Sequence, residues 1–147
     1  MKKFGLLLCT MFAGILTMYG QGAKNIKINE VLTNNTANLQ DEFGNRRAWV
    51  ELANTSFSTY DVRGMYITTD RRVLNKGLSV PQRIKMMSCI PNGDSRTSMS
   101  AREHLLFFLN SNPSHGMLHL SAKTDSCKPT WIALYDGNAI DIIDSIT

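Results

Sequence analysis

Apolar and polar residues alternate along much of the chain, which is the pattern of β-strands that bury one face. In residues 25–32, Ile26 and Ile28 fall on one face before the polar pair Asn29 and Glu30 breaks the alternation. A break of this kind predicts a bulge or a bend within a strand. We therefore expect the first strand here, with an irregularity at its centre.

The segment AWVELANTS places a carboxylate inside an apolar run. Side chains alternate along a strand, so Val50 and Leu52 are expected to share the face toward the core. Trp49 and Glu51 then point outward, and an Arg or Lys on a neighbouring strand is expected to pair with Glu51. This outer face, with Trp49 and Glu51, and the polar loop at residues 34–47 form the predicted partner-binding surface.

Two further segments carry strand signals. Residues 60–70 are expected to form a strand with Gly64 inside it, where a glycine usually marks a bulge or a close approach of backbone. Residues 103–111 are apolar on both faces over about five positions, which predicts a central strand covered on both sides. Residues 71–94, between these two segments, contain two prolines and predict only weak strands or loops.

Asp136, Gly137 and Asn138 are predicted to join two alternating segments, residues 130–136 and 139–147, as a hairpin turn. About eight or nine short strands at this spacing, with little helix periodicity, predict an all-β fold, either a β-sandwich or a small barrel. The length of 147 residues is typical of one domain.

The N-terminus has the layout of a secretory signal peptide. Lys2 and Lys3 precede an apolar run, and small or polar residues follow it. An apolar run of about 13 residues is too short for a membrane span, which needs roughly 20. We expect residues 1–22 to be the signal, with cleavage after Gly20 or Gly22, and residues 23–147 to be one exported domain in the periplasm or cell envelope.

Charge and composition exclude some partners. The chain has 16 Lys and Arg residues against 12 Asp and Glu, and two of the cations, Lys2 and Lys3, lie in the signal segment. The small surplus that remains gives no case for nucleic acid or an acidic membrane as partner. No cofactor or small-molecule substrate is indicated.

Three cysteines are present, and Cys9 lies in the signal segment. The other two, Cys89 and Cys127, are a possible disulfide, because exported proteins meet an oxidising compartment. Two free buried thiols are the alternative, since the sequence does not show whether the two side chains meet.

Candidate chemistry is sparse. A metal site needs two or three histidines or cysteines at one point, typically with a carboxylate. His104, His115 and His119 are the only histidines, and no H-x-x-x-H or C-x-x-C spacing falls on a single predicted element. We therefore expect ordinary strand-end or surface histidines and no metal site.

Two other arrangements give no stronger signal. The acidic cluster near the C-terminus, Asp136, Asp141 and Asp144, does not have the spacing of an EF-hand loop and is expected to serve turns and the surface. A Ser-His-Asp triad would have to be recognised by geometry, and the chain has no G-x-S-x-G motif. No catalytic residue is predicted.

Four segments in the same order resemble the lamin tail domain family: residues 28–30, 49–54 and 62–70, and the closing hairpin. The residues that carry the resemblance are Asn29, Glu30, Trp49, Glu51, Asn54, Gly64, Asp136, Gly137 and Asp144. The resemblance implies an immunoglobulin-like β-sandwich over residues 25–147 and no catalysis. Some exported bacterial relatives carry this module ahead of the membrane helix of a subunit resembling the gamma chain of sodium-pumping decarboxylases.

The sequence thus predicts a non-catalytic exported module that binds or scaffolds in the cell envelope, with another envelope protein or a membrane subunit as partner. The alternative is the extracytoplasmic N-terminal domain of a gamma-type pump subunit, of which this chain would be a truncated form. A small exported hydrolase is a third hypothesis.

Overall fold

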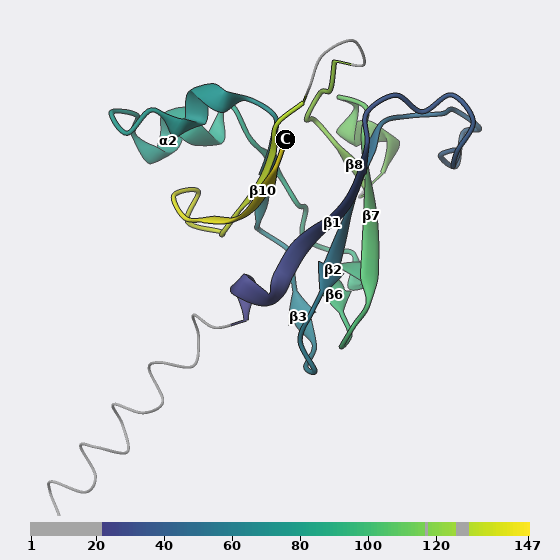
Figure 1. Ribbon diagram of the computed structural model, residues 1–147, viewed down its shortest axis with the longest axis horizontal. Coiled ribbons are helices and arrows are strands. Elements are labelled where there is room, and N and C mark those ends of the chain that lie inside the picture. The colour runs from purple at the N-terminus through teal and green to yellow at the C-terminus, as the bar shows by residue number, and fades with distance from the viewer. Residues whose placement is uncertain (1–21, 117, 126–129) are drawn as a thin grey trace, which may run out of the picture.

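The computed structural model describes residues 22–116, 118–125 and 130–147, and these are mostly β-strands with little helix (Figure 1). The predicted all-β fold is therefore confirmed. The strands are β1 (Ile26–Leu32), β2 (Trp49–Asn54), β3 (Tyr60–Asp61), β4 (Tyr66–Thr68), β5 (Ser88–Cys89), β6 (Ser98–Met99), β7 (His104–Leu109), β8 (His119–Leu120), β9 (Ile132–Tyr135) and β10 (Ile142–Ile146). The helical elements are α2 (Val80–Ile84) and the 3₁₀ turns η2 (Ala23–Asn25), η3 (Arg71–Leu74), η4 (Ser95–Thr97) and η5 (Pro113–His115). Among the described residues, no helix has the length and apolar character needed to cross a membrane.

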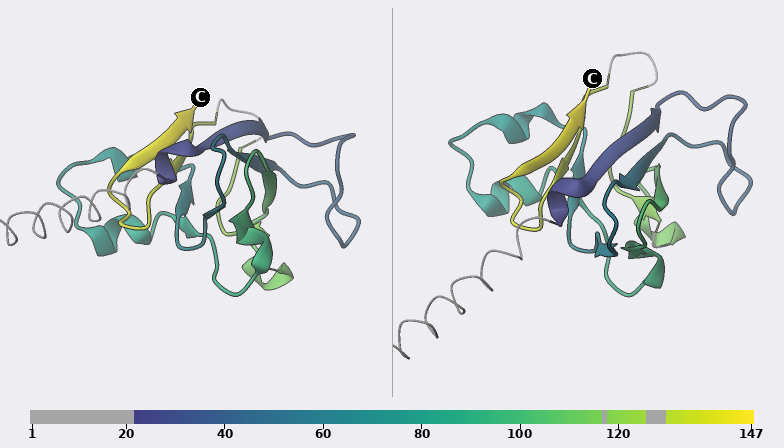
Figure 2. Two further views of the ribbon diagram at one scale, coloured as in Figure 1. Left: turned by 90° about the horizontal axis from the view of Figure 1, so that it is seen from below. Right: turned by 60° about the horizontal axis from the view of Figure 1, so that its bottom comes forward.

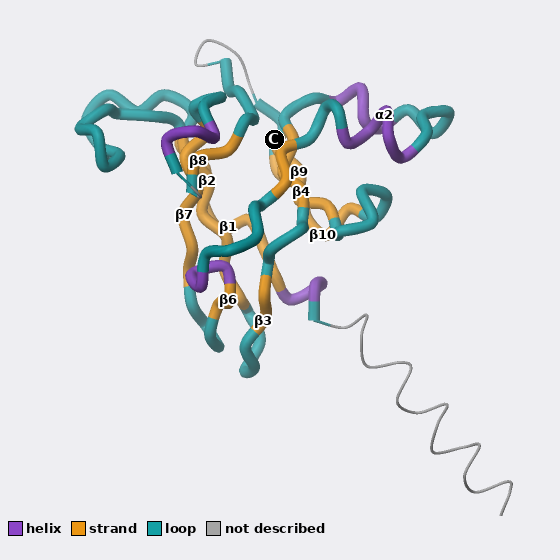
Figure 3. Tube along the Cα trace, turned by 180° about the vertical axis from the view of Figure 1, so that it is seen from behind, coloured by secondary structure: helices purple, strands orange, loops and turns teal. Residues whose placement is uncertain are grey.

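The strands form two four-stranded sheets and one small pair. The first sheet has the order β1-β2-β7-β8, the second has the order β10-β9-β4-β5, and β3 pairs with β6. Seen from behind, the two larger sheets stand side by side with the β3–β6 pair at one end (Figure 3). Neighbouring strands are antiparallel except for β7 and β8, which run parallel.

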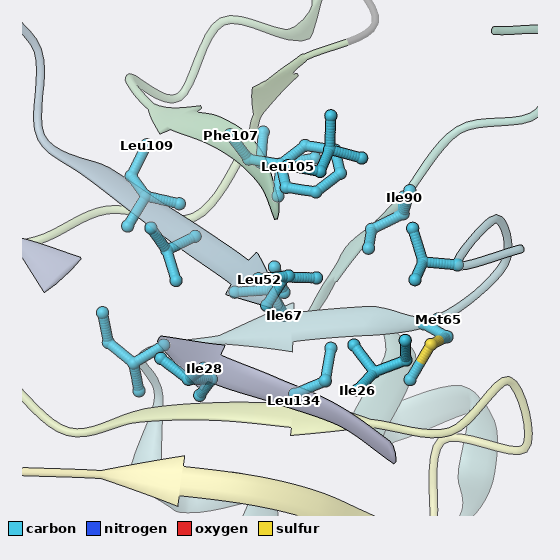
Figure 4. Close-up of a cluster of buried hydrophobic side chains, with 14 of the residues drawn as sticks. Ile26, Ile28, Leu52, Met65, Ile67, Ile90, Leu105, Phe107, Leu109 and Leu134 are labelled. Carbon is cyan, nitrogen blue, oxygen red and sulfur yellow. The ribbon is translucent and has the colours of Figure 1, made fainter. Parts of the chain in front are cut away.

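One hydrophobic core joins the two sheets. The inward side chains of β2 and β7, including Leu52, Leu105 and Phe107, gather with Ile67 of β4 and Leu134 of β9 (Figure 4). Val50 and Leu52 are fully buried in this cluster, as the alternation along β2 predicts. The inner position of β7 in its sheet is also confirmed.

Asp144 connects the two sheets at their adjoining edges. The register of β1 against β2 shifts between Ile28 and Glu30, which confirms the predicted irregularity at Asn29 and Glu30. At this bulge the backbone N–H of Ile28 donates to Asp144 Oδ2 of β10 at 2.9 Å. The side chain of Asp144 therefore satisfies a backbone donor of β1, the edge strand of the first sheet.

Residues 60–94 differ from the prediction. The expected single strand at residues 60–70 is wrong: β3 and β4 belong to different sheets, and Gly64 lies in the turn between them with φ +76°. Residues 71–94, expected to form weak strands or loops, contain the two-residue strand β5 but also the helical elements η3 and α2. The short helix α2 begins where the Gln82 side chain accepts a hydrogen bond from the Ser79 backbone at 2.8 Å, a cap that stabilises a helix N-terminus.

Candidate functional site

A row of three side chains crosses the outer face of the first sheet. Trp49 of β2 stands opposite Phe108 of β7, and Phe108 stands opposite His119 of β8. The rings of Phe108 and His119 stack with their centroids 5.2 Å apart. Trp49 is only 3 % exposed and His119 only 1 % exposed. This end of the outer face is therefore buried and not exposed to solvent.

The prediction that Trp49 faces solvent as part of a partner-binding face is therefore wrong. Alternation along β2 does place Trp49 on the face away from the main core, beside Phe108 of β7, but the side chain is buried there all the same. Glu51, two residues on, is half-buried, and its Oε1 accepts a hydrogen bond from Asn29 Nδ2 of β1 at 2.7 Å. The partner of Glu51 is thus an amide on the neighbouring strand instead of the expected Arg or Lys.

The loop between β1 and β2, residues 33–48, contacts this row. Glu42 Oε2 lies 2.9 Å from His119 Nε2, and the Phe43 ring lies 4.6 Å from the His115 ring, centroid to centroid. Gly116 permits this approach, because a Cβ at that position would lie only 3.3 Å from Glu42 Oε1. The φ of Gly116, +141°, is also one that residues with a side chain rarely adopt. The loop is therefore fixed against the segment that joins η5 to β8.

Asp41 organises the half of the loop that contacts the histidines. Its Oδ1 accepts hydrogen bonds from the backbone N–H groups of Phe43 at 3.0 Å and Asn45 at 2.7 Å. Gly44 closes this turn with φ +78°, and its N–H donates to the Asp41 carbonyl at 2.9 Å. Burial alone would raise the pKa of Asp41, but the two backbone donors and the nearby Arg47 outweigh burial and lower it. Asp41 is thus an ionised, enclosed carboxylate.

Asn35 organises the other half of the loop. Its Nδ2 donates to the carbonyls of Leu39 at 2.7 Å and Arg47 at 2.9 Å, and its Oδ1 accepts from the N–H of Asn38 at 2.9 Å. These bonds hold the loop in a defined shape that extends from the body of the molecule (Figure 2). The shape leaves Leu39 52 % exposed and Phe43 56 % exposed. It also forms an open groove of about 610 Å³, lined by Leu32, Asn34, Thr36, Ala37, Asn38 and Leu39.

The two histidines at the base of the loop converge, contrary to the prediction. Asn110 Nδ2 lies 2.7 Å from His119 Nδ1 and 3.4 Å from His115 Nδ1. His119 is a buried residue and not the strand-end or surface histidine expected from the sequence. His104, by contrast, is exposed at the start of β7, as expected.

The spacing of four residues between His115 and His119 is a signal that could have indicated this convergence. On a helix, two histidines at this spacing lie on one face and can bind the same metal ion. Here η5 ends at His115, Gly116 turns the chain, and His119 opens β8, so the two side chains meet through a turn. No periodic pattern in the sequence indicates such a geometry.

The other residues of the lamin-tail resemblance lie at separate structural positions. Asn54 is buried at the end of β2, and Asp136 and Gly137 lie in the connection from β9 to β10. Cys89 is exposed, while Cys127 lies outside the described residues, so the disulfide stays a prediction.

Comparison with known proteins gives no match to a family model, to a curated protein or to a solved structure. The resemblance to the lamin tail domain family therefore stays a prediction. What the chain does has to be argued from its own geometry.

The depressed pKa of Asp41 predicts a loss of stability in acid. A carboxylate whose pKa is lower in the folded chain than in the unfolded chain stabilises the fold fully above its unfolded pKa, about 3.9 for Asp. That contribution disappears as the pH falls through the folded pKa, which lies lower. We expect Asp41→Asn to reduce the difference in unfolding free energy between pH 6 and pH 3, measured by urea denaturation at both pH values. An unchanged difference would contradict this role of Asp41.

Proposed function

We propose that the chain is a non-catalytic binding or scaffolding module of the cell envelope, and that the β1–β2 loop is its contact surface. The observation that supports the proposal is the exposure of Leu39 and Phe43 on a loop held by its own hydrogen bonds. Apolar side chains on an ordered loop lose less conformational entropy on binding than those on a flexible loop. The loop therefore suits recognition of another protein.

The groove beside Leu39 supports a protein partner in particular. Leu32 and Leu39 offer apolar surface, and Asn34, Thr36 and Asn38 offer polar groups next to it. Protein interfaces combine an apolar, often aromatic, centre with a polar rim in this way. The partner proposed is another envelope protein or a membrane subunit.

The finer fold that we propose is the immunoglobulin-like sandwich of the lamin tail domain family. Support comes from the two four-stranded sheets that share one core. Further support comes from the contacts that motif residues make between strands, Asn29 with Glu51 and Asp144 with Ile28. The envelope location rests on the signal-peptide pattern of residues 1–22, of which 1–21 lie outside the described residues.

The test of this function is co-purification of a partner from the cells that make the chain natively. We expect the tagged chain to retain a defined partner protein, and Leu39→Ser to reduce its yield by at least about tenfold, the effect of losing an anchor worth about 1.4 kcal/mol. Leu74→Ser is the matched control, because Leu74 is a similarly exposed leucine, 46 % against 52 %, on η3.

A partner lost to the same extent from the Leu74 and Leu39 variants would contradict a specific role of the loop. A partner that leaves the membrane fraction only in detergent would identify a membrane subunit, as the gamma-type alternative predicts. A partner in the soluble envelope fraction would support a free module.

A further inference from the structure

The cluster at the base of the β1–β2 loop contains the donor atoms of a metal site. Asp41, His115 and His119 each offer one ligand atom, and these three atoms lie within 4.8 Å of one another. Two imidazoles and one carboxylate are a ligand set that zinc and other divalent transition metals take in proteins, with a further position left for water. The three residues come from the loop, from η5 and from β8, so the site forms only in the folded chain.

Asp41 has an oxygen for which the protein supplies no hydrogen bond. Its side chain is fully buried, and Oδ1 already accepts two backbone N–H groups. Oδ2 is buried without a hydrogen-bond partner, and the nearest cation, Arg47 Nε, is 3.5 Å away and also unbonded. An ionised oxygen left in this state costs free energy unless another ligand satisfies it. A metal ion beside the histidines would satisfy it.

Glu42 stands where a supporting carboxylate stands in metal sites. A histidine that binds zinc through one ring nitrogen usually donates its other N–H to a carboxylate, which fixes the ring and strengthens its basicity. Here Glu42 Oε2 lies 2.9 Å from His119 Nε2. The other ring nitrogen, Nδ1, lies 2.7 Å from Asn110 Nδ2, and His115 Nδ1 lies 3.4 Å from the same amide nitrogen. A metal ion bound through these two nitrogens would therefore take the place of the Asn110 amide.

We propose that the chain binds one divalent transition-metal ion, with zinc as the best-suited ion, through Asp41, His115 and His119. The charges around the site are the carboxylates of Asp41 and Glu42 and the guanidinium of Arg47, with Arg96 close enough to Glu42 to interact with it. Arg47 competes with a cation for Asp41 Oδ2, because its Nε lies 3.5 Å from that oxygen, although the side chain as a whole is 39 % exposed. The bound ion joins the β1–β2 loop to the β8 segment. This inference goes beyond the proposed function and does not depend on it.

The test is metal binding by the purified chain after treatment with a chelator. We expect calorimetry to give one Zn²⁺ per chain, and Co²⁺ to give the strong visible absorption of a site with four or five ligands. Zinc should also raise the midpoint of thermal unfolding, because it binds the folded chain only. We expect His115→Ala to lower zinc affinity by at least about tenfold and to abolish the thermal shift.

His104→Ala is the matched control, since His104 is an exposed histidine outside the cluster and its loss should leave both readouts unchanged. His115 is only half-buried, so its alanine variant should fold, and circular dichroism checks this. His119 is buried, and Glu42→Gln tests its supporting contact instead, with a smaller loss of affinity expected.

Absence of stoichiometric binding by the wild-type chain would overturn the proposal. Equal zinc affinity of the folded His115 variant and the wild-type chain would do the same. Neither result involves a partner protein, so neither bears on the proposed binding function.

Discussion

Replacing Phe107 with alanine is expected to lower the free energy of unfolding by about 3–5 kcal/mol. Phe107 is fully buried on β7, an inner strand of its sheet, and its ring lies among side chains contributed by both large sheets (Figure 4). Removal of the ring loses its burial and leaves a cavity that strands on two sides can close only in part. The effect is a large fraction of the stability typical of a domain of this size.

Urea denaturation followed by fluorescence or circular dichroism measures this loss. Phe57→Ala is the matched control, because Phe57 is 85 % exposed and its ring contacts Arg102, with the guanidinium carbon 4.2 Å from the ring centroid. We expect the control to cost less than about 1 kcal/mol, the range of an exposed cation–π contact. Similar losses for the two phenylalanines would mean that Phe107 does not belong to the shared core.

Replacing Asn54 with alanine is expected to cost about 2–4 kcal/mol, because buried hydrogen bonds lose one partner. Asn54 is 1 % exposed at the end of β2, and its Nδ2 donates to the carbonyls of Ser58 at 2.8 Å, Met99 at 3.2 Å and Ser100 at 3.0 Å. Its Oδ1 accepts from the N–H of Ser56 at 3.0 Å. The side chain thus fixes two separate turns to each other.

Asn54→Asp sharpens the test, because it keeps the acceptor toward Ser56 and replaces the donor with a second acceptor. An ionised carboxylate at position 54 would face carbonyl oxygens without a proton to share, so we expect this variant to be at least as destabilised as the alanine variant at neutral pH. Asn92→Ala, at an exposed bend, is the control and should stay within about 0.5 kcal/mol of the wild-type chain. If Asn54→Asp matched the wild-type stability, the hydrogen bonds that Asn54 Nδ2 donates would not carry the energy assigned to them.

The features that the sequence predicts well are those that depend on alternation over several residues. Val50 and Leu52 face the core, and β7 is an inner strand, because a buried face requires apolar residues at every second position. The polar pair at residues 29–30 marks the bulge for the same reason. The two strand segments after residue 60 are too short for periodicity to separate them from turns, and the prediction merged them.

The features that the sequence does not predict depend on contacts between distant segments. Trp49 lies on the outward side of β2, next to Phe108 of β7, and is buried all the same. His115 and His119 lie close to each other and to Asp41 because of how the turns and the β1–β2 loop fold. The alternation of apolar and polar residues carries no information about the geometry of turns and loops. Only the four-residue spacing of the histidines was visible in the sequence.

The central claim, that the β1–β2 loop contacts a partner, is tested most directly by photo-crosslinking in the cells that make the chain. A photoreactive amino acid at position 39 samples the exposed side of the loop, and the same group at position 74 samples a similarly exposed position on η3. We predict a discrete light-dependent adduct with one protein from position 39 and none of that adduct from position 74. The same adducts from both positions, or no adduct from position 39, would contradict the proposal that the loop is a recognition surface.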